Sequence, residues 1–179
     1  MNVAHTTSQD RIVILALDGQ RYALPLSAVE RVIRAVAVTP VPETPAFVFG
    51  VVNMAGKMVP VVSLRACFGL PGRPIRPEDQ FVIARTSRLT LALVVDEVQG
   101  LSAVDAAQTV AVEDALPGGE RGVRGLAKLD GGIIQICDMD RLIGQEDQDR
   151  LLDCEGVMEG GRPRPPESGD GGPSPSRNE

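Results

Sequence analysis

The stretch GVVNMAGKMVPVV, residues 50–62, places two glycines and a lysine between two apolar runs. A phosphate-binding loop of the G-x-x-x-x-G-K-[ST] type needs four residues between its glycines and a hydroxyl side chain after the lysine. Here five residues separate the glycines, and a methionine follows the lysine. The stretch therefore predicts no nucleotide site. It predicts a hairpin, in which residues 54–56 form the turn between two strands.

A duplication extends outward from this hairpin. The segment GKMVPVVSLRACFG, 56–69, matches GGIIQICDMDRLIG, 131–144, at an offset of 131 − 56 = 75 residues. A second pair, RYALPLSAV at 21–29 and TLALVVDEV at 90–98, has an offset of 90 − 21 = 69 residues. The offsets differ by 75 − 69 = 6 residues, which a surface loop absorbs at little cost in free energy. The two halves of the chain therefore share one structural plan.

Short apolar segments separated by glycine-containing turns occur throughout both halves. Asp18 and Gly19 supply the positive φ angles that a two-residue hairpin turn requires. Pro60 has no backbone N–H group to donate, which predicts an edge position or a bulge for its strand. The pattern predicts an all-β fold with short helices, built from two small closed β-barrels, because closure removes exposed strand edges.

Two segments carry helical signals. The segment SAVERVIRAV, 27–36, has Ser27 in N-cap position and apolar residues at helical spacing, but toward its end the β-branched residues favour a strand equally. The segment from Arg141 to residue 155 predicts a C-terminal helix that is interrupted by Gly144 and packs on the body through its leucines.

Composition divides the 179 residues into three parts. These are a flexible leader at 1–10, a compact body at 11–155 with barrel halves at about 11–70 and 80–143, and a disordered tail at 156–179. The tail is rich in Gly, Pro and Ser and has almost nothing to bury. It is either a plain tail or a tether.

The overall composition argues against nucleic acid and membrane partners. The net charge is −6, aromatic residues make up 3% of the chain and Trp is absent, so the basic and stacking surfaces of nucleic-acid binders are missing. Polar residues interrupt every apolar run before it reaches the ~20 residues that a membrane-spanning helix needs. The start of the chain also lacks the apolar core of a signal peptide, so we expect a cytosolic protein.

No group of residues predicts catalysis, a metal or a cofactor. The three cysteines, Cys67, Cys137 and Cys154, form no C-x-x-C pair and are expected to be buried or incidental thiols, and the single histidine, His5, lies in the leader. The acidic pairs at 96–97 and 138–140 sit at segment ends, where they are expected to cap turns. Linker arginines Arg73 and Arg76 are expected to be solvated.

Apolar residues remain that two small barrels do not obviously bury. They are Val29, Val32, Val36 and Val38 in the first half, and Val98 and Leu101 in the second. One interpretation makes them the seam between the barrels. The other makes them a groove that receives an amphipathic helix of a partner.

The segment TPAFVFGVVNMAGKMVPVVSLRACFGL, 44–70, is similar to the signature of the CheW family of chemotaxis coupling proteins. In that signature Thr-Pro-x-Phe leads to Gly-Val-x-Asn-Leu-Arg-Gly, then to Pro-Val-x-Asp-Leu and Phe-Gly. LALVVDEVQGL and GLAKLDGGIIQICDMDRLI resemble the second half of the same family, so the resemblance covers about 11–143. It implies two intertwined, SH3-like, five-stranded β-barrels.

The same resemblance implies an adaptor that has no catalytic activity and no cofactor. Such an adaptor couples the cytoplasmic tips of chemoreceptor hairpins to the regulatory domain of a CheA-type histidine kinase, and is recruited from the cytoplasm to membrane-associated receptor arrays. Two alternatives stay open, which are an adaptor of the same fold in a non-flagellar chemosensory pathway with other partners, and an unrecognised small enzyme.

Carried over position by position, the resemblance also implies two binding surfaces. The receptor-binding residues would be Val29, Arg31, Val32, Asn53, Met54, Ala55, Val98 and Leu101, and the kinase-binding residues Val38, Thr39, Lys57 and Met58. Three positions depart from the family pattern. Ala55 replaces the usual Arg, Ser63 replaces the usual Asp, and Arg31 stands where the first short helix frequently has an acidic residue.

Overall fold

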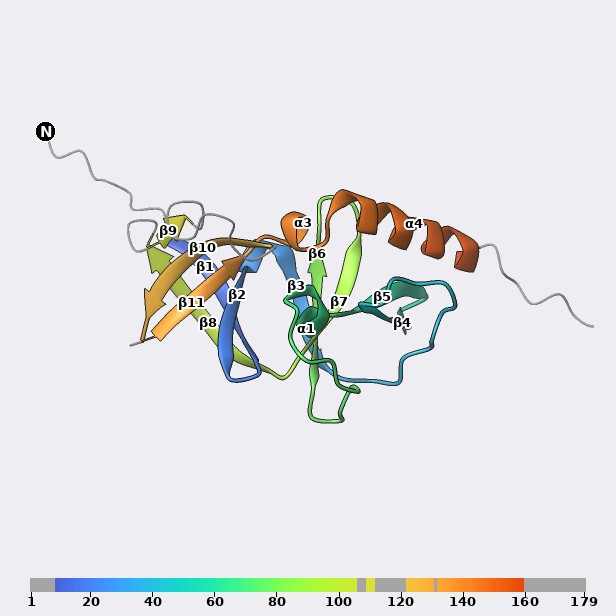
Figure 1. Ribbon diagram of the computed structural model, residues 1–179, viewed down its shortest axis with the longest axis horizontal. Coiled ribbons are helices and arrows are strands. Elements are labelled where there is room, and N and C mark those ends of the chain that lie inside the picture. The colour runs from blue at the N-terminus through green and yellow to red at the C-terminus, as the bar shows by residue number, and fades with distance from the viewer. Residues whose placement is uncertain (1–8, 106–108, 112–121, 131, 160–179) are drawn as a thin grey trace, which may run out of the picture.

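The computed structural model describes residues 9–105, 109–111, 122–130 and 132–159. These residues form two β-sheets that lie side by side along the long axis of the molecule (Figure 1). Within these ranges, none of the helices has both the length and the apolar character needed to cross a membrane.

The first sheet has six strands, and the second has five. In hydrogen-bonded order the first contains β8 (Glu97–Asp105), β1 (Gln9–Leu17), β2 (Gln20–Pro25), β11 (Gly132–Cys137), β10 (Val123–Leu129) and β9 (Thr109–Ala111). The second contains β3 (Val29–Arg34), β6 (Gln80–Arg85), β7 (Thr90–Val95), β5 (Lys57–Ser63) and β4 (Val48–Met54). The helices are the 3-10 turn η1 (Leu26–Ala28), α1 (Leu64–Cys67), α3 (Met139–Leu142) and α4 (Gln145–Glu159). The expected β-rich class with short helices is confirmed.

The closed barrels expected from the sequence do not form among the described residues, because each sheet ends in two edge strands. The edge of β4 is covered instead by a single bridge, in which Thr39 and Val51 exchange backbone hydrogen bonds at 2.9 Å. Prolines at 40, 42 and 45 follow Thr39. Since proline has no N–H group, this segment cannot continue as a strand that closes the second sheet.

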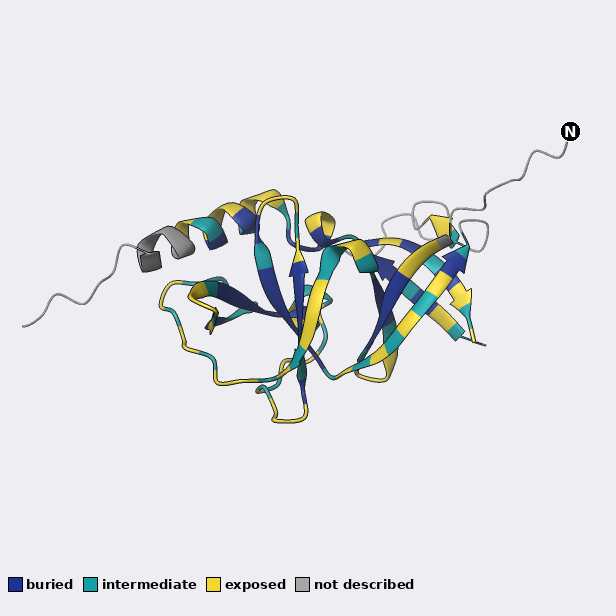
Figure 2. Cartoon of the chain, turned by 180° about the vertical axis from the view of Figure 1, so that it is seen from behind, coloured by how far each residue is buried: buried dark blue, intermediate teal, exposed yellow. Residues whose placement is uncertain are grey.

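The core consists of three apolar clusters. A central cluster lies between the sheets and includes Leu15, Tyr22, Val82, Leu93 and Leu151. A first-sheet cluster includes Ile12, Ala23 and Ile134, and a second-sheet cluster includes Val59, Phe81 and Ile83. Each sheet therefore curls around its own cluster and shares the central one with its neighbour. Figure 2 shows that the buried positions of α4 face the strands while its exposed positions face away.

Two hairpin turns follow the sequence prediction. Asp18 and Gly19 have φ angles of 52° and 76° between β1 and β2, and Ala55 and Gly56 have 53° and 87° between β4 and β5. Positive φ at both central positions is typical of the two-residue turn that matches the twist of paired strands. Asn53 supports the second turn, because its Oδ1 accepts a hydrogen bond from the Gly56 N–H at 2.8 Å.

The edge position expected for Pro60 is wrong, because β5 is an interior strand between β7 and β4, and the bulge of the β4–β5 pair lies next to Pro60, where the register shifts between Val48 and Gly50. Pro60 lies opposite Val51, whose N–H and C=O groups both point to Thr39 and away from β5. The nitrogen of Pro60 therefore faces β7, and pairing with β7 begins only at Val61. The missing N–H group falls where the sheet needs no donor.

The duplication is visible in three dimensions. Ser63 caps α1 by accepting a hydrogen bond from the Ala66 N–H, and Asp138, at 63 + 75, caps α3 by accepting from two backbone N–H groups. The parallel pairings correspond as well. Ala23 lies opposite Ile136 in the first sheet, and the equivalent residues Ala92 and Val61 lie opposite each other in the second.

The sequence halves and the sheets divide the chain differently. The segment 11–70 supplies β1 and β2 to the first sheet and β3 to β5 to the second, and 80–143 likewise contributes to both. The second sheet uses one continuous segment, 29–95, and the strands of the first sheet flank it in sequence. The C-terminal helix extends to Glu159, beyond the expected end at 155. The expected leader, up to residue 8, and the expected tail, from 160 onward, lie outside the described residues.

Candidate protein-binding site

A β-bulge in β3 sets which way its valines face. Val29 lies opposite Ala84 and Val32 opposite Val82, with a register shift at Glu30 between them. Residues three apart in a regular strand face opposite sides, but the extra residue of a bulge restores both to one side. Ala84 and Val82 belong to the central cluster, so both valines lie on the face turned toward the other sheet.

The same arrangement occurs in β8. Val98 lies opposite Leu15 and Leu101 opposite Val13, and the register shifts between them so that Gln99 is the extra residue. Leu15 and Val13 also belong to the central cluster. Val98 and Leu101 therefore share the face of the first sheet that is turned toward the second.

A hydrogen bond joins the start of β8 to β6, the strand beside β3 in the second sheet. The N–H of Val98 donates to Oε1 of Gln80 at 2.6 Å, and Gln80 lies opposite Arg34 at the end of β3. Val29 and Val98 are partly buried against the central cluster, whereas Val32 and Leu101 are 38% and 57% exposed. We call Val29, Val32, Val98 and Leu101 the seam residues. Two of them pack into the seam, as the first interpretation expects, and two remain open to solvent, where the groove interpretation stays a prediction.

The helical interpretation of segment 27–36 is wrong beyond η1, and the strand interpretation is confirmed. Spacings of three residues at Val29 and Val32 come from the bulge and not from a helix. Arg31 therefore lies in β3 and not in a short helix. It pairs with Ile83 of the second-sheet cluster, on the opposite face of the strand from the seam residues.

Arg31 joins a different group of the predicted residues. It lines a hollow of about 240 Å³ together with Met54 and Ala55 of the β4–β5 hairpin and Lys57 at the start of β5. The structure thus separates Arg31, Met54 and Ala55 from the seam residues, with which the resemblance grouped them. It brings them together with Lys57, which the resemblance assigned to the kinase.

The remaining predicted residues lie elsewhere. Asn53 holds the hairpin turn through its side chain, and Met58 lies opposite it in β5. Val38 packs against the second-sheet cluster, and Thr39 covers the edge of β4. The predicted kinase-binding residues therefore divide between this edge and the hairpin.

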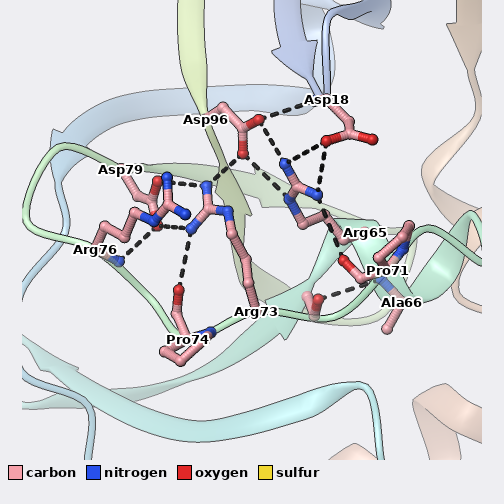
Figure 3. A network of polar contacts seen from close by, with 10 residues as sticks. Asp18, Arg65, Ala66, Pro71, Arg73, Pro74, Arg76, Asp79 and Asp96 are labelled. Carbon is pink, nitrogen blue, oxygen red and sulfur yellow. Dashed lines mark hydrogen bonds and ion pairs between the residues drawn. The ribbon is translucent and has the colours of Figure 1, made fainter.

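An ion-pair network that the sequence did not predict fixes the two sheets to each other (Figure 3). Asp96, which lies between β7 and β8, accepts hydrogen bonds from Arg65 at 2.8 Å and Arg73 at 2.6 Å. It also accepts one at 2.9 Å from the N–H of Asp18, in the β1–β2 turn of the first sheet. Arg73 reaches further, to the carboxylate of Asp79.

The network lowers the pKa of both carboxylates that it surrounds. Burial alone would raise the pKa of Asp79, but hydrogen bonds from Arg73 and from the Arg76 N–H outweigh it, so the pKa lies below its ordinary value. The same balance holds for Asp96, where hydrogen bonds from Arg65, Asp18 and Arg73 oppose burial. Both groups are therefore charged in the folded protein at neutral pH.

The solvated role expected for Arg73 is wrong, since its side chain is 17% exposed and ion-paired twice.

For Asp140 a backbone hydrogen bond from Ser87 is the largest cause of a lowered pKa, and the Ser87 hydroxyl also donates to it at 2.7 Å. Asp138 caps α3 as expected. No sequence signal connects Asp18 to Asp96, because they are 78 residues apart.

The described part of the chain contains no group of three or more His, Cys, Asp or Glu residues placed to hold a metal ion. Cys137 belongs to the central cluster and Cys67 packs against it, as expected for buried thiols. His5 and the side chain of Cys154 lie outside the described residues.

Comparison with known proteins gives a consistent result. Residues 11–147 match the CheW-like domain family. A chemotaxis protein CheW from Thermotoga maritima is 28% identical over 141 residues, which cover 79% of this chain and 92% of that protein. Protein FrzA from Myxococcus xanthus is 31% identical over 97 residues, covering 54% and 57%. The crystal structure of the scaffolding protein TtCheW from Thermoanaerobacter tengcongensis superposes with a TM-score of 0.70 at 27% identity, covering 78% of this chain and 95% of that one.

Proposed function

Because the chain belongs to the CheW-like domain family, we propose that it is a non-catalytic adaptor of chemotaxis signalling. It couples the cytoplasmic tips of chemoreceptors to the regulatory domain of a CheA-type histidine kinase. It acts in the cytoplasm, at receptor arrays on the membrane. The proposal rests on the family match and on the scaffold description carried by its structural relative.

The seam residues are the observation that best supports this role. Equivalent bulges in β3 and β8 leave one exposed apolar residue on each of these two edge strands, Val32 and Leu101, on the faces that the two sheets turn toward each other. Apolar side chains presented from two edges suit an amphipathic helix, which lays its apolar face into such a surface. A chemoreceptor tip is a helical hairpin and provides a partner of this kind.

The ion-pair network supports the same role by fixing the surface in advance. Asp96 contacts groups from the first sheet, from α1 and from the 70–79 linker at once, so the two sheets are held in one relative orientation. A preformed surface costs less conformational entropy on binding than one that must be ordered by its partner. The adaptor therefore presents a fixed shape to two different proteins.

A second candidate function is an adaptor of the same fold with a different partner set. The charges of the hollow at the β4–β5 hairpin favour this candidate. Arg31 and Ala55 both depart there from the family pattern, so Arg31 contributes a positive charge and position 55 contributes none. Charge at a binding surface decides which partner is accepted. The two candidates differ in partner identity and not in mechanism.

The test is reconstitution with a CheA-type kinase and a chemoreceptor-tip fragment from the same cell. We expect a three-component complex and a kinase phosphorylation rate that rises with added adaptor until the two are stoichiometric. A kinase and tip from a second chemosensory pathway of that cell separate the two candidates. Turnover of a small molecule by this protein alone, at substoichiometric amounts, would refute the adaptor function.

A further inference from the structure

The hollow at the β4–β5 hairpin carries positive charge that the described part of the chain does not neutralise. Arg31 and Lys57 line it, and neither forms an ion pair with any described residue. Glu30 lines it too, but it is already paired with Arg85 at 3.3 Å. Two cations therefore remain uncompensated at one place on a chain whose net charge is −6.

Three apolar residues form the floor of the same hollow. These are Met54, Val59 and Ile83, but Val59 and Ile83 are each 2% exposed within the second-sheet cluster, so Met54 supplies most of the accessible apolar side chain. Ala55 at the turn carries no side chain long enough to fill the space. A volume of about 240 Å³ leaves room for one side chain of a partner to rest on this floor.

A second hollow lies beside the first, and an extended segment that leaves the first would pass over it. The second hollow has a volume of about 510 Å³ and shares Lys57 and Thr90 with the first. Its other lining residues include Ser27, Arg85 and Arg88, which offer hydroxyl and guanidinium donors, but also the carboxylate of Asp140. Arg88 is already paired with Asp149, so the strongest attraction for an anion stays at Arg31 and Lys57.

We propose that this hollow binds an acidic segment of a protein partner, in which one apolar side chain stands between carboxylates. The apolar side chain rests on Met54, over the buried Val59 and Ile83, and the flanking carboxylates pair with Arg31 and Lys57. Charge complementarity decides against a cationic segment, and the apolar floor decides against a purely acidic one. The site lies on the opposite face of β3 from the seam residues, so a helix on the seam and a segment in the hollow do not compete.

This inference rests on the proposed function only in that the adaptor binds other proteins. Its test uses the purified chain alone. The probe is the capped peptide Glu-Glu-Leu-Glu-Glu, titrated into the isotope-labelled full chain and followed by NMR. The comparison peptides are Gln-Gln-Leu-Gln-Gln, without charge, and Glu-Glu-Gly-Glu-Glu, without the apolar side chain. The expected amide shifts fall at 30–31, 54–57, 83 and 90, and affinity falls as salt screens the charges.

Two variants and one matched control complete the experiment. Arg31→Glu and Lys57→Glu should each weaken the peptide by about fivefold, the upper range for loss of one exposed ion pair. Arg34→Glu makes the same charge change on the same strand, outside the hollow, and should alter affinity by less than about twofold. Gel filtration of the unmodified chain tests whether a second copy occupies the site.

The inference is overturned by equal weakening in all three variants, by equal binding of the three peptides, by the absence of binding, or by a dimer that Arg31→Glu dissociates. Reconstitution with kinase and receptor separates these failures from failure of the proposed function. Coupling that persists while the peptide fails to bind refutes the hollow alone. Peptide binding in a protein that couples nothing refutes the adaptor function alone.

Discussion

Arg73 and Asp79 form a two-point ion pair, in which Nη1 donates to Oδ2 and Nη2 to Oδ1, both at 2.7 Å. Asp79 is 2% exposed and also accepts a hydrogen bond from the Arg76 N–H. Paired guanidinium and carboxylate groups of this geometry are both strong and directional. The pair therefore anchors the linker between the sequence halves against the start of β6.

Removing the carboxylate from this pair should destabilise the fold. Asp79→Asn leaves the guanidinium of Arg73 with Asp96 alone in a mostly buried place, and we expect a loss of about 3 kcal/mol in the free energy of unfolding. Urea unfolding measures it. Asp149→Asn, which removes the exposed pair with Arg88, is the control and should cost less than about 1 kcal/mol. Equal effects would show that the network contributes nothing special.

The same network predicts acid sensitivity. The folded-state pKa values of Asp79 and Asp96 lie below their unfolded values, so the stability they provide is complete above the unfolded pKa of about 3.9 and is lost as pH falls through the folded pKa. The free energy of unfolding should therefore decline from roughly pH 4 downward. Asp79→Asn should flatten this decline. A curve as steep as that of the unmodified protein would place the acid sensitivity elsewhere.

Gly50 should tolerate no side chain. Its φ angle is 139°, and a Cβ there would collide with the carbonyl oxygen of Thr39, which bridges to Val51. Gly50→Ala should cost at least about 2 kcal/mol by combining backbone strain with loss of this bridge. Gly72→Ala, at a linker position with open space, should change stability by less than about 0.5 kcal/mol. Thermal unfolding compares the two, and a tolerant Gly50 would mean that the bridge is dispensable.

Charge at the seam should weaken partner binding without unfolding the protein. Val32 and Leu101 are exposed, so Val32→Asp and Leu101→Asp should change the unfolding midpoint little. Each should weaken binding of a receptor-tip fragment by at least about tenfold, since a charge opposes burial of an apolar helix face. Calorimetry measures the affinity. Ile133→Asp, at a 68% exposed site in β11, is the control, and an equal loss there would move the binding surface away from the seam.

The repeated pattern in the sequence predicted the most about the fold. The offset of 75 residues placed Ser63 and Asp138 at equivalent positions, and both cap a short helix in the structure. The turn residues Asp18 and Gly19 were also sufficient, because positive φ at both positions has a local cause. Features set by neighbouring residues were therefore predictable.

The bulges and the network were not predictable from the sequence. A spacing of three between Val29 and Val32 fits a helical turn as well as a bulged strand, and only pairing with β6 distinguishes the two. Asp96 meets Arg73 across 23 residues and Arg65 across 31. Such contacts depend on how the two sheets are placed, which no local pattern encodes. The positions of the candidate site residues were named by resemblance, but their separation into seam and hollow required the structure.

The interruption of the first sheet by the second bears on how the protein is made. The segment 29–95 holds every strand of the second sheet, so a ribosome delivers that sheet as one uninterrupted piece. The β1–β2 hairpin is synthesised earlier but finds its partners only in β8 and β11, which are both synthesised after the whole second sheet. Since pairing between distant segments forms slowly, the unpaired hairpin edges are exposed to other chains throughout synthesis. The oldest part of the nascent chain is thus protected only after the second sheet has been synthesised, and a pause in translation after residue 95 leaves it as the segment most prone to aggregate.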